Sequence, residues 1–84
     1  MDDESIANRI ENLVTEERKL RRREAADSGH AEQLEEDQRR LQAVEVELDR
    51  CWDLLRRRRA LREAGGDPNQ AEARDADTVE RYLQ

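Results

Sequence analysis

The feature that most constrains the fold is a seven-residue repeat of leucine in the middle of the chain. The repeat consists of Leu34, Leu41, Leu48 and Leu55, and Val44 and Cys51 fill the intermediate positions of the same stripe. A strict repeat of seven keeps one narrow apolar stripe on one side of a helix, where it faces a partner helix. The stretch is therefore predicted to be a helix of the coiled-coil type.

Composition limits the core that such a helix can share. Of the 84 residues, 45% are charged and 2% are aromatic, whereas about a quarter of the residues are charged in ordinary globular domains. High charge with low hydrophobicity is also typical of disordered chains, but here the apolar residues are periodic and most polar positions are good helix formers. We therefore expect one small all-α domain with a thin core.

Turn residues divide the chain into two long helices and a tail. We expect a first helix over residues 4–26, a break over residues 27–30, and a longer second helix over residues 31–64 that Gly65 and Gly66 end. In the break, Asp27 or Ser28 is a candidate cap for the second helix. The apolar stripe of the first helix contains Ile6, Ile10, Leu13, Glu17 and Leu20.

The tail, residues 67–84, contains two helix-start signals. Asp67 followed by Pro68 predicts a short turn of helix up to Ala73. The sequence Asp77-Thr78-Val79-Glu80 resembles a capping box and predicts a final short helix. The tail is therefore expected to be helical in two short pieces.

Charge favours an antiparallel arrangement of the two long helices. If the chain reverses near Gly29, the basic run 18–23 faces the acidic run 32–37, and the acidic residues 2–4 approach the basic run 56–59. A parallel dimer in register would instead place residues 56–59 beside their own copy, which like charges disfavour. The apolar pairs expected in the hairpin are Ile6 with Cys51, Ile10 with Leu48 and Leu13 with Val44. The predicted fold is an all-α antiparallel helical hairpin, similar to a coiled coil, with a short helical tail at the C-terminus.

The difference in length between the two helices leaves apolar side chains near the end of the second helix without a cover. The candidate partner-binding residues are Trp52, Leu54, Leu55 and Leu61, with Arg56, Arg57, Arg58 and Arg59 setting the orientation of the partner. Either the tail lays Val79, Tyr82 and Leu83 on this surface, or a second copy of the chain covers it. Because two helices alone bury little surface, a homodimer is favoured over a monomer.

Arg58 differs from its neighbours because it falls on the apolar stripe. It is expected either to pair with an acid there or to mark where the first helix stops. The four arginines point in four directions around a helix, so a solvated face is the simpler interpretation of the run.

The segment Cys51-Trp52-Asp53-Leu54-Leu55, within a longer stretch from Glu47 to Pro68, is similar to the domain of unknown function 2630 family of small actinobacterial proteins. The opening residues 2–6 and the closing residues 79–84 resemble the same family. The unbroken run 56–59 departs from the family pattern, in which Gln stands among the arginines, so a function that needs all four arginines would not extend to the family. The resemblance implies a single short domain and supplies no activity, cofactor or site residue.

No group of residues indicates catalysis. His30 stands alone at the break, without the companions that a metal site or a general base requires. Cys51 is the only cysteine, and its place on the apolar stripe predicts an inert, hydrophobic thiol. Glu17 on the other stripe is expected to fix the register by pairing with Arg21 or Arg40. We predict no catalytic, cofactor-binding or metal-binding residue.

The sequence favours a non-enzymatic cytoplasmic protein that binds other proteins, or its own copy, through helix faces. The alternative is a nucleic-acid or transcription-machinery accessory protein that uses the arginine-rich runs 18–23 and 56–59. The net charge of −6 and the absence of an aromatic residue near the first run weigh against nucleic acid. The acidic start, with no apolar run after it, and the lack of about 20 consecutive apolar residues predict neither a secretory signal nor a membrane span.

Overall fold

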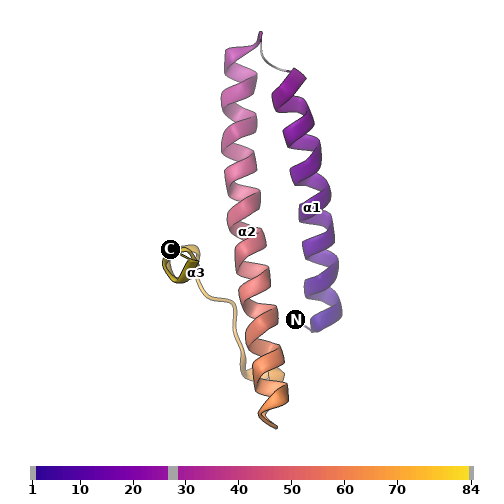
Figure 1. The fold of residues 1–84 in the computed structure, drawn as a ribbon, viewed down its shortest axis with the longest axis vertical. Coiled ribbons are helices and arrows are strands. Elements are labelled where there is room, and N and C mark those ends of the chain that lie inside the picture. The colour runs from indigo at the N-terminus through magenta and orange to yellow at the C-terminus, as the bar shows by residue number, and fades with distance from the viewer. Residues whose placement is uncertain (1, 27–28, 84) are drawn as a thin grey trace.

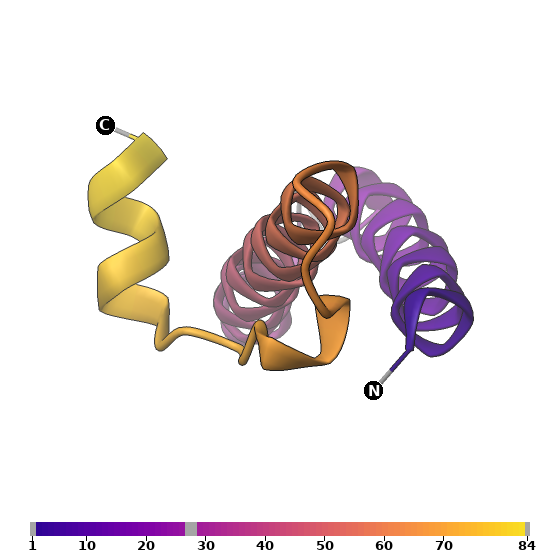
Figure 2. The ribbon, with the colours of Figure 1, turned by 90° about the horizontal axis from the view of Figure 1, so that it is seen from below.

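The computed structural model describes residues 2–26 and 29–83, with side chains through Arg81. The described chain contains helix α1 (Asp3–Ala26), helix α2 (Ala31–Glu63), the 3-10 turn η1 (Pro68–Gln70) and helix α3 (Ala76–Leu83). Helices α1 and α2 run antiparallel along the longest dimension of the molecule, which is 54 Å (Figure 1). Viewed from below, α2 lies between α1 and α3 (Figure 2). The predicted hairpin with a short helical tail is confirmed.

The core is a seam of apolar side chains between α1 and α2. Its buried members are Ile6, Ile10, Leu13 and Leu20 from α1 and Leu41, Val44, Leu48, Cys51 and Leu54 from α2. All of the apolar pairs expected from the sequence belong to this one cluster. Full burial of an aliphatic side chain stabilises the fold by about 1.5–3 kcal/mol, so the seam is the main source of stability.

Ion pairs across the seam fix the register of the two helices. Arg40 Nε donates to Glu16 Oε1 at 2.6 Å, and Arg23 lies 3.1 Å from the buried Asp37. The basic end of α1 therefore does face the acidic start of α2, as the charge pattern predicts. Glu17 lies 3.8 Å from Arg21, one of the two partners expected for it, but both residues belong to α1, so this pair does not fix the register between the helices. The other expected partner, Arg40, pairs with Glu16 instead.

The two ends of α2 are capped in different ways. At its start, His30 is the capping residue and makes no side-chain hydrogen bond, and the predicted caps Asp27 and Ser28 lie outside the described residues. At its end, Gly65 has a positive φ of 81°, and the N–H of Gly66 donates to the carbonyl of Leu61 at 2.8 Å. This left-handed glycine closure is the helix end that the Gly65-Gly66 pair predicts.

The tail begins as predicted and then departs from the prediction. Asp67 Oδ1 accepts from the N–H of Asn69 at 2.9 Å, so Asp67 caps η1, which ends at Gln70 rather than at Ala73. Helix α3 starts at Ala76, because Asp75 Oδ1 accepts from the N–H of Thr78 at 2.8 Å. The capping box proposed to begin at Asp77 is therefore wrong, and the cap lies two residues earlier.

Candidate functional site

Among the described residues, the most exposed large apolar side chain is Trp52 on α2. Among the described side chains it is the one large hydrophobic group classed as exposed, at 43%. Arg56 and Arg59, which are also exposed, follow it at spacings of four and seven and therefore share its side of the helix. We call these three residues the Trp52 stripe.

The four consecutive arginines of α2 have two different roles. Arg56 and Arg59 point to solvent, whereas Arg57 and Arg58 are built into the fold. Arg58 is 5% exposed; its Nε donates to Asp3 Oδ1 at 2.6 Å, and its Nη1 donates to the Pro68 carbonyl at 3.2 Å. Arg58 thus pairs with an acid, one of the two outcomes predicted for it, and joins the start of α1 to η1.

The Asp3 carboxylate is held from two sides. Hydrogen bonds from Arg58 and then Arg62 lower the pKa of Asp3. The start of α1 lies beside Arg58 and Arg62. Leu54 and Leu55 therefore lie alongside α1, whereas the difference in helix length had suggested that this part of α2 lacks a cover.

The leucines predicted to join Trp52 in a contact surface lie elsewhere. Leu54 is buried, with 6% of its surface exposed, and Leu55 is half-buried against the seam. Leu61 is also half-buried. Leu54 is therefore unavailable to a partner in this structure, because α1 and the tail enclose it.

Helix α3 lies on the side of α2 away from α1 (Figure 2), and the segment before it packs against the seam between the two long helices. Ala71 packs against the seam, and Val79 is 1% exposed. Of the two covers considered for this end of α2, the structure shows the tail on Leu54, and it leaves Trp52 uncovered. The side chains of Tyr82 and Leu83, which were also expected there, lie outside the described part of the chain.

A buried carboxylate that the sequence analysis missed attaches the tail to α2. Asp53 is 5% exposed and accepts hydrogen bonds from Arg74 of the tail and, at 3.1 Å, from Arg57 Nε. These guanidinium groups, Arg74 first, lower the pKa of Asp53 against the opposing effect of burial. The acid-first spacing of four between Asp53 and Arg57 was a signal in the sequence, but nothing there indicated Arg74.

Besides Arg58, the side chains of Arg50 and Arg57 bind the backbone of the tail. Arg50 Nε donates to the carbonyl of Arg74 at 2.9 Å, and Arg57 Nη2 donates to the carbonyl of Glu72. With Arg57 and Arg58 occupied inside the molecule, only half of the run 56–59 is free to contact a phosphate or a partner protein.

A second missed feature is a pair of carboxylates where α3 crosses α2. One oxygen of Glu80, Oε1, is buried and has no hydrogen-bond partner among the described residues. The neighbouring carboxylate of Asp49, followed by burial, raises the pKa of Glu80. This contact is therefore least favourable when both groups are ionised.

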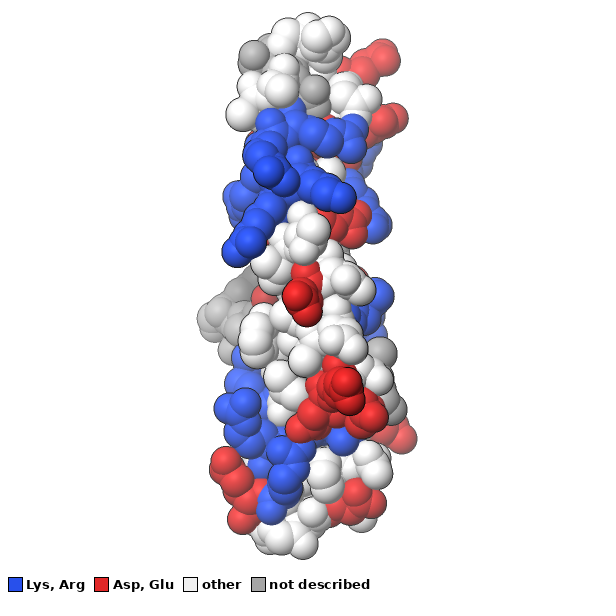
Figure 3. Space-filling model, turned by 90° about the vertical axis from the view of Figure 1, so that its right-hand side faces the viewer, with Lys and Arg blue, Asp and Glu red and all other residues white. Residues whose placement is uncertain are grey.

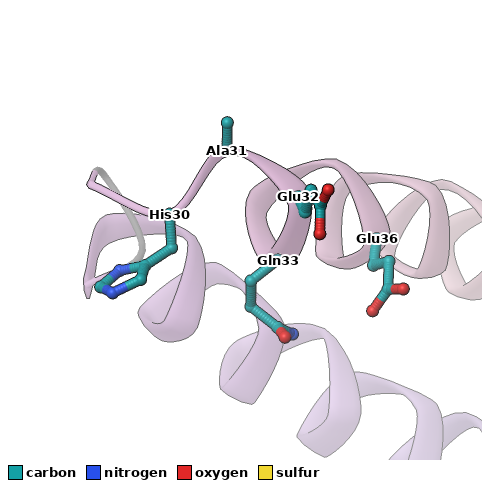
Figure 4. Close-up of a pocket in the computed structure, with 5 residues that line it drawn as sticks. All are labelled: His30, Ala31, Glu32, Gln33 and Glu36. Atoms are coloured by element: carbon teal, nitrogen blue, oxygen red, sulfur yellow. The ribbon is translucent and has the colours of Figure 1, made fainter.

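Cys51 and His30, the remaining side chains considered for reactivity, lie in separate parts of the structure. Cys51 is buried in the seam, and burial raises the pKa of its thiol, so the reactive thiolate is disfavoured. His30 is exposed at the rim of an open hollow beside the turn (Figure 4). Within residues 2–26 and 29–83 no three His, Cys, Asp or Glu side chains are grouped so that they could hold a metal ion.

Comparison with known proteins places the chain in a family. A family model described as "Protein of unknown function (DUF2630)" matches residues 2–84. The chain belongs to this family. An uncharacterized protein of Mycobacterium bovis and two of Mycobacterium tuberculosis are each 51% identical over 81 residues, which is 96% of this chain and 88% of each relative. No solved structure matches.

The resemblance of the segment around Trp52 to this family is thus confirmed over nearly the whole chain. The family description carries no activity, so the function has to be argued from the surface of the molecule. None of the described helices is both long enough and apolar enough to cross a membrane.

Proposed function

We propose that this protein is a non-enzymatic interaction module whose principal contact surface is the Trp52 stripe. The observation that carries the proposal is the 43% exposure of Trp52, whereas the other large apolar side chains among the described residues are buried or half-buried. Tryptophan and arginine are the residues most enriched where binding energy concentrates at protein interfaces. The stripe presents Trp52 with two arginines beside it.

The partner that we propose for the stripe is a second copy of the chain. The hairpin has a thin core for its size, and small helical domains gain stability by association. A two-fold dimer would bring each Trp52 against the same face of its partner, since the commonest homodimers use one self-complementary surface. The half-buried Leu55 on the rim of the seam would add apolar area.

Trp52 is the only tryptophan, so its fluorescence tests the proposal at the residue itself. Sedimentation equilibrium of the wild-type chain should show dimers at high micromolar concentration, and the emission maximum of Trp52 should move to shorter wavelength over the same concentration range. A strict monomer at the highest concentration contradicts the dimer.

Substitution separates the stripe from the rest of α2. Trp52→Ala should shift the chain toward monomer, whereas Gln42→Ala, an exposed residue of the same helix, should leave association unchanged. Equal association of Trp52→Ala and the wild type would show that the stripe is not the interface. The proposal also includes a cytoplasmic location, which fractionation of cells that produce the protein tests.

A further inference from the structure

The last two turns of α1 carry positive charge that the hairpin does not neutralise. Arg18, Lys19 and Arg22 are all exposed, and none of them is ion-paired or hydrogen-bonded to the part of the chain that the structure describes. We call these three residues the α1 basic surface. Figure 3 shows a cluster of Lys and Arg side chains toward the turn end of this side of the molecule and a second group of them toward the opposite end.

The neighbouring cations have partners, which makes the contrast informative. Arg21 lies 2.6 Å from Glu45, and Arg23 lies 3.1 Å from Asp37. Of the five basic residues in the run 18–23, Arg23 pairs with the facing acidic run 32–37 and Arg21 pairs with Glu45 further along α2. The carboxylates nearest the seam are already engaged, so they are not available to the three outer cations.

The spacing of the outer cations suits a ligand with regularly placed anionic groups. Arg18 and Arg22 are one helical turn apart, roughly 6 Å along the axis, and Lys19 stands beside them at a spacing of three from Arg22. Guanidinium groups bind carboxylates or phosphates through two parallel hydrogen bonds. An anionic partner would also relieve the repulsion among three like charges.

The surroundings of the α1 basic surface favour a short acidic segment over a long polyanion. Toward the start of α1 the exposed Glu11 follows, and around the turn Glu32 and Glu36 line the open hollow of about 490 Å³ with His30 (Figure 4). A nucleic-acid strand that continued past the three cations would meet these carboxylates. Helix α1, which carries the α1 basic surface, contains no aromatic residue, so it offers a nucleic-acid base no side chain on which to stack.

We propose that the α1 basic surface docks an acidic segment of a partner protein, with carboxylates one helical turn apart on Arg18 and Arg22. The exposed Glu32 and Glu36 would then meet basic residues that flank the acidic ones in the partner, a mixed pattern that proteins have and nucleic acids lack. This surface lies at the turn end of the hairpin, away from the Trp52 stripe, which lies at the level of the start of α1. The two surfaces can be occupied independently.

The test uses three fluorescent probes with the full-length protein at low salt. The first is a helical peptide of Ala and Glu with glutamates four residues apart, the second is the same peptide with Gln in place of Glu, and the third is a single-stranded oligonucleotide of equal negative charge. Fluorescence anisotropy should show that the Glu peptide binds at least about tenfold more tightly than the Gln peptide, and that added salt weakens the binding.

Matched substitutions locate the site. Arg18→Gln/Arg22→Gln should weaken binding of the Glu peptide at least about fivefold, while Arg39→Gln/Arg81→Gln, an equal charge change at two other exposed positions, should not. Circular dichroism confirms that both variants remain helical. Arg18→Glu/Arg22→Glu should reverse the preference and bind a Lys peptide of the same spacing, so a loss of affinity cannot be mistaken for misfolding.

Three results would overturn the proposal. The first is no binding of the Glu peptide at low salt. The second is equal weakening by the two double substitutions, which would indicate a general charge effect. The third is tighter binding of the oligonucleotide than of the Glu peptide with the same dependence on Arg18 and Arg22, which would assign the surface to nucleic acid.

Discussion

The two sides of α2 are covered in different ways. Toward α1 the helix presents a periodic apolar stripe, and the buried side chains of both helices form one cluster. Toward the tail it presents Arg50, Asp53 and Arg57, which bind a guanidinium group and backbone carbonyls. Apolar contact from the described part of the tail comes from Ala71 and Val79.

The two kinds of contact contribute differently: the apolar seam supplies stability, and the polar contacts fix the position of the tail. Burial of apolar area is non-directional and large in sum, so the α1–α2 seam supplies most of the free energy of folding. A hydrogen bond contributes only about 0.5–1.5 kcal/mol net, but it fixes where its partners lie. We therefore expect the tail to detach from α2 before the hairpin unfolds.

The largest effect is expected from a cavity in the seam. Ile6 is fully buried, and Ile6→Ala should lower the free energy of unfolding by about 2–5 kcal/mol, because it removes buried methyl groups and leaves a void. Urea denaturation followed by circular dichroism measures this loss. Asn8→Ala, an exposed position of the same helix, serves as the control, and an equal effect of the two would show that the seam does not dominate stability.

The second effect is expected on the tail alone. Asp53→Asn leaves Arg74 and Arg57 without their anionic acceptor, and hydrogen bonds to charged groups contribute about 1.5–3 kcal/mol. Amide hydrogen exchange in residues 67–83 should accelerate about 10- to 100-fold, while the protection of the α1–α2 seam stays close to that of the wild type. Asp77→Asn, at an exposed position of α3, is the matched control. Equal loss of protection in both regions would mean that the hairpin and the tail form one cooperative unit.

Lowering the pH should weaken the attachment of the tail at Asp53. The pKa of Asp53 is lowered in the folded protein, chiefly by Arg74, so its contribution is present above the unfolded value of about 3.8 and is lost as the pH falls through the folded value. Between neutral pH and pH 5 the contact between Asp53 and Arg74 should therefore hold.

The side of α2 that faces α1 could be predicted from the sequence, because its rules are periodic. Leucines at a spacing of seven, a stripe spaced four and three in residues 6–20, and opposite charges in facing runs each follow from the geometry of a helix. The pairing of Arg58 with an acid was one of the two outcomes expected for it, because an unpaired cation on an apolar stripe is costly. Gly65 likewise predicted where α2 ends.

The side that faces the tail could not be predicted in the same way. Arg50 and Arg57 bind backbone carbonyl groups. Because every residue has a carbonyl, the sequence does not indicate which one will accept the hydrogen bond. Asp53 stands between Trp52 and Leu54 without a periodic signal, and its partner Arg74 is 21 positions away. A contact surface that combined Leu54 with Trp52 was expected because the path of the tail was unknown.

The smallest effect should come from Glu80, and its sign is opposite to that of Asp53. The pKa of Glu80 is raised, first by the neighbouring carboxylate of Asp49 and then by burial. Its contribution to the docking of α3 is therefore fully present below the unfolded value of about 4.5 and is lost as the pH rises through the folded value. Between acid and neutral pH, the protection factor of the Val79 amide, which corrects for the intrinsic rise of amide exchange with pH, should fall while the protection factors of residues 69–74 stay the same.

Glu80→Gln should remove this pH dependence, because the amide keeps a hydrogen-bonding group beside Asp49 without the second negative charge. At neutral pH the variant should protect the Val79 amide better than the wild type does. Glu72→Gln, an exposed residue of the tail, should leave the profile of Val79 unchanged. A wild-type tail that loosens uniformly from residue 68 to residue 83 with pH would mean that Asp53 and Glu80 hold a single unit. Separate profiles would show that the tail is docked at two points that respond to pH in opposite directions.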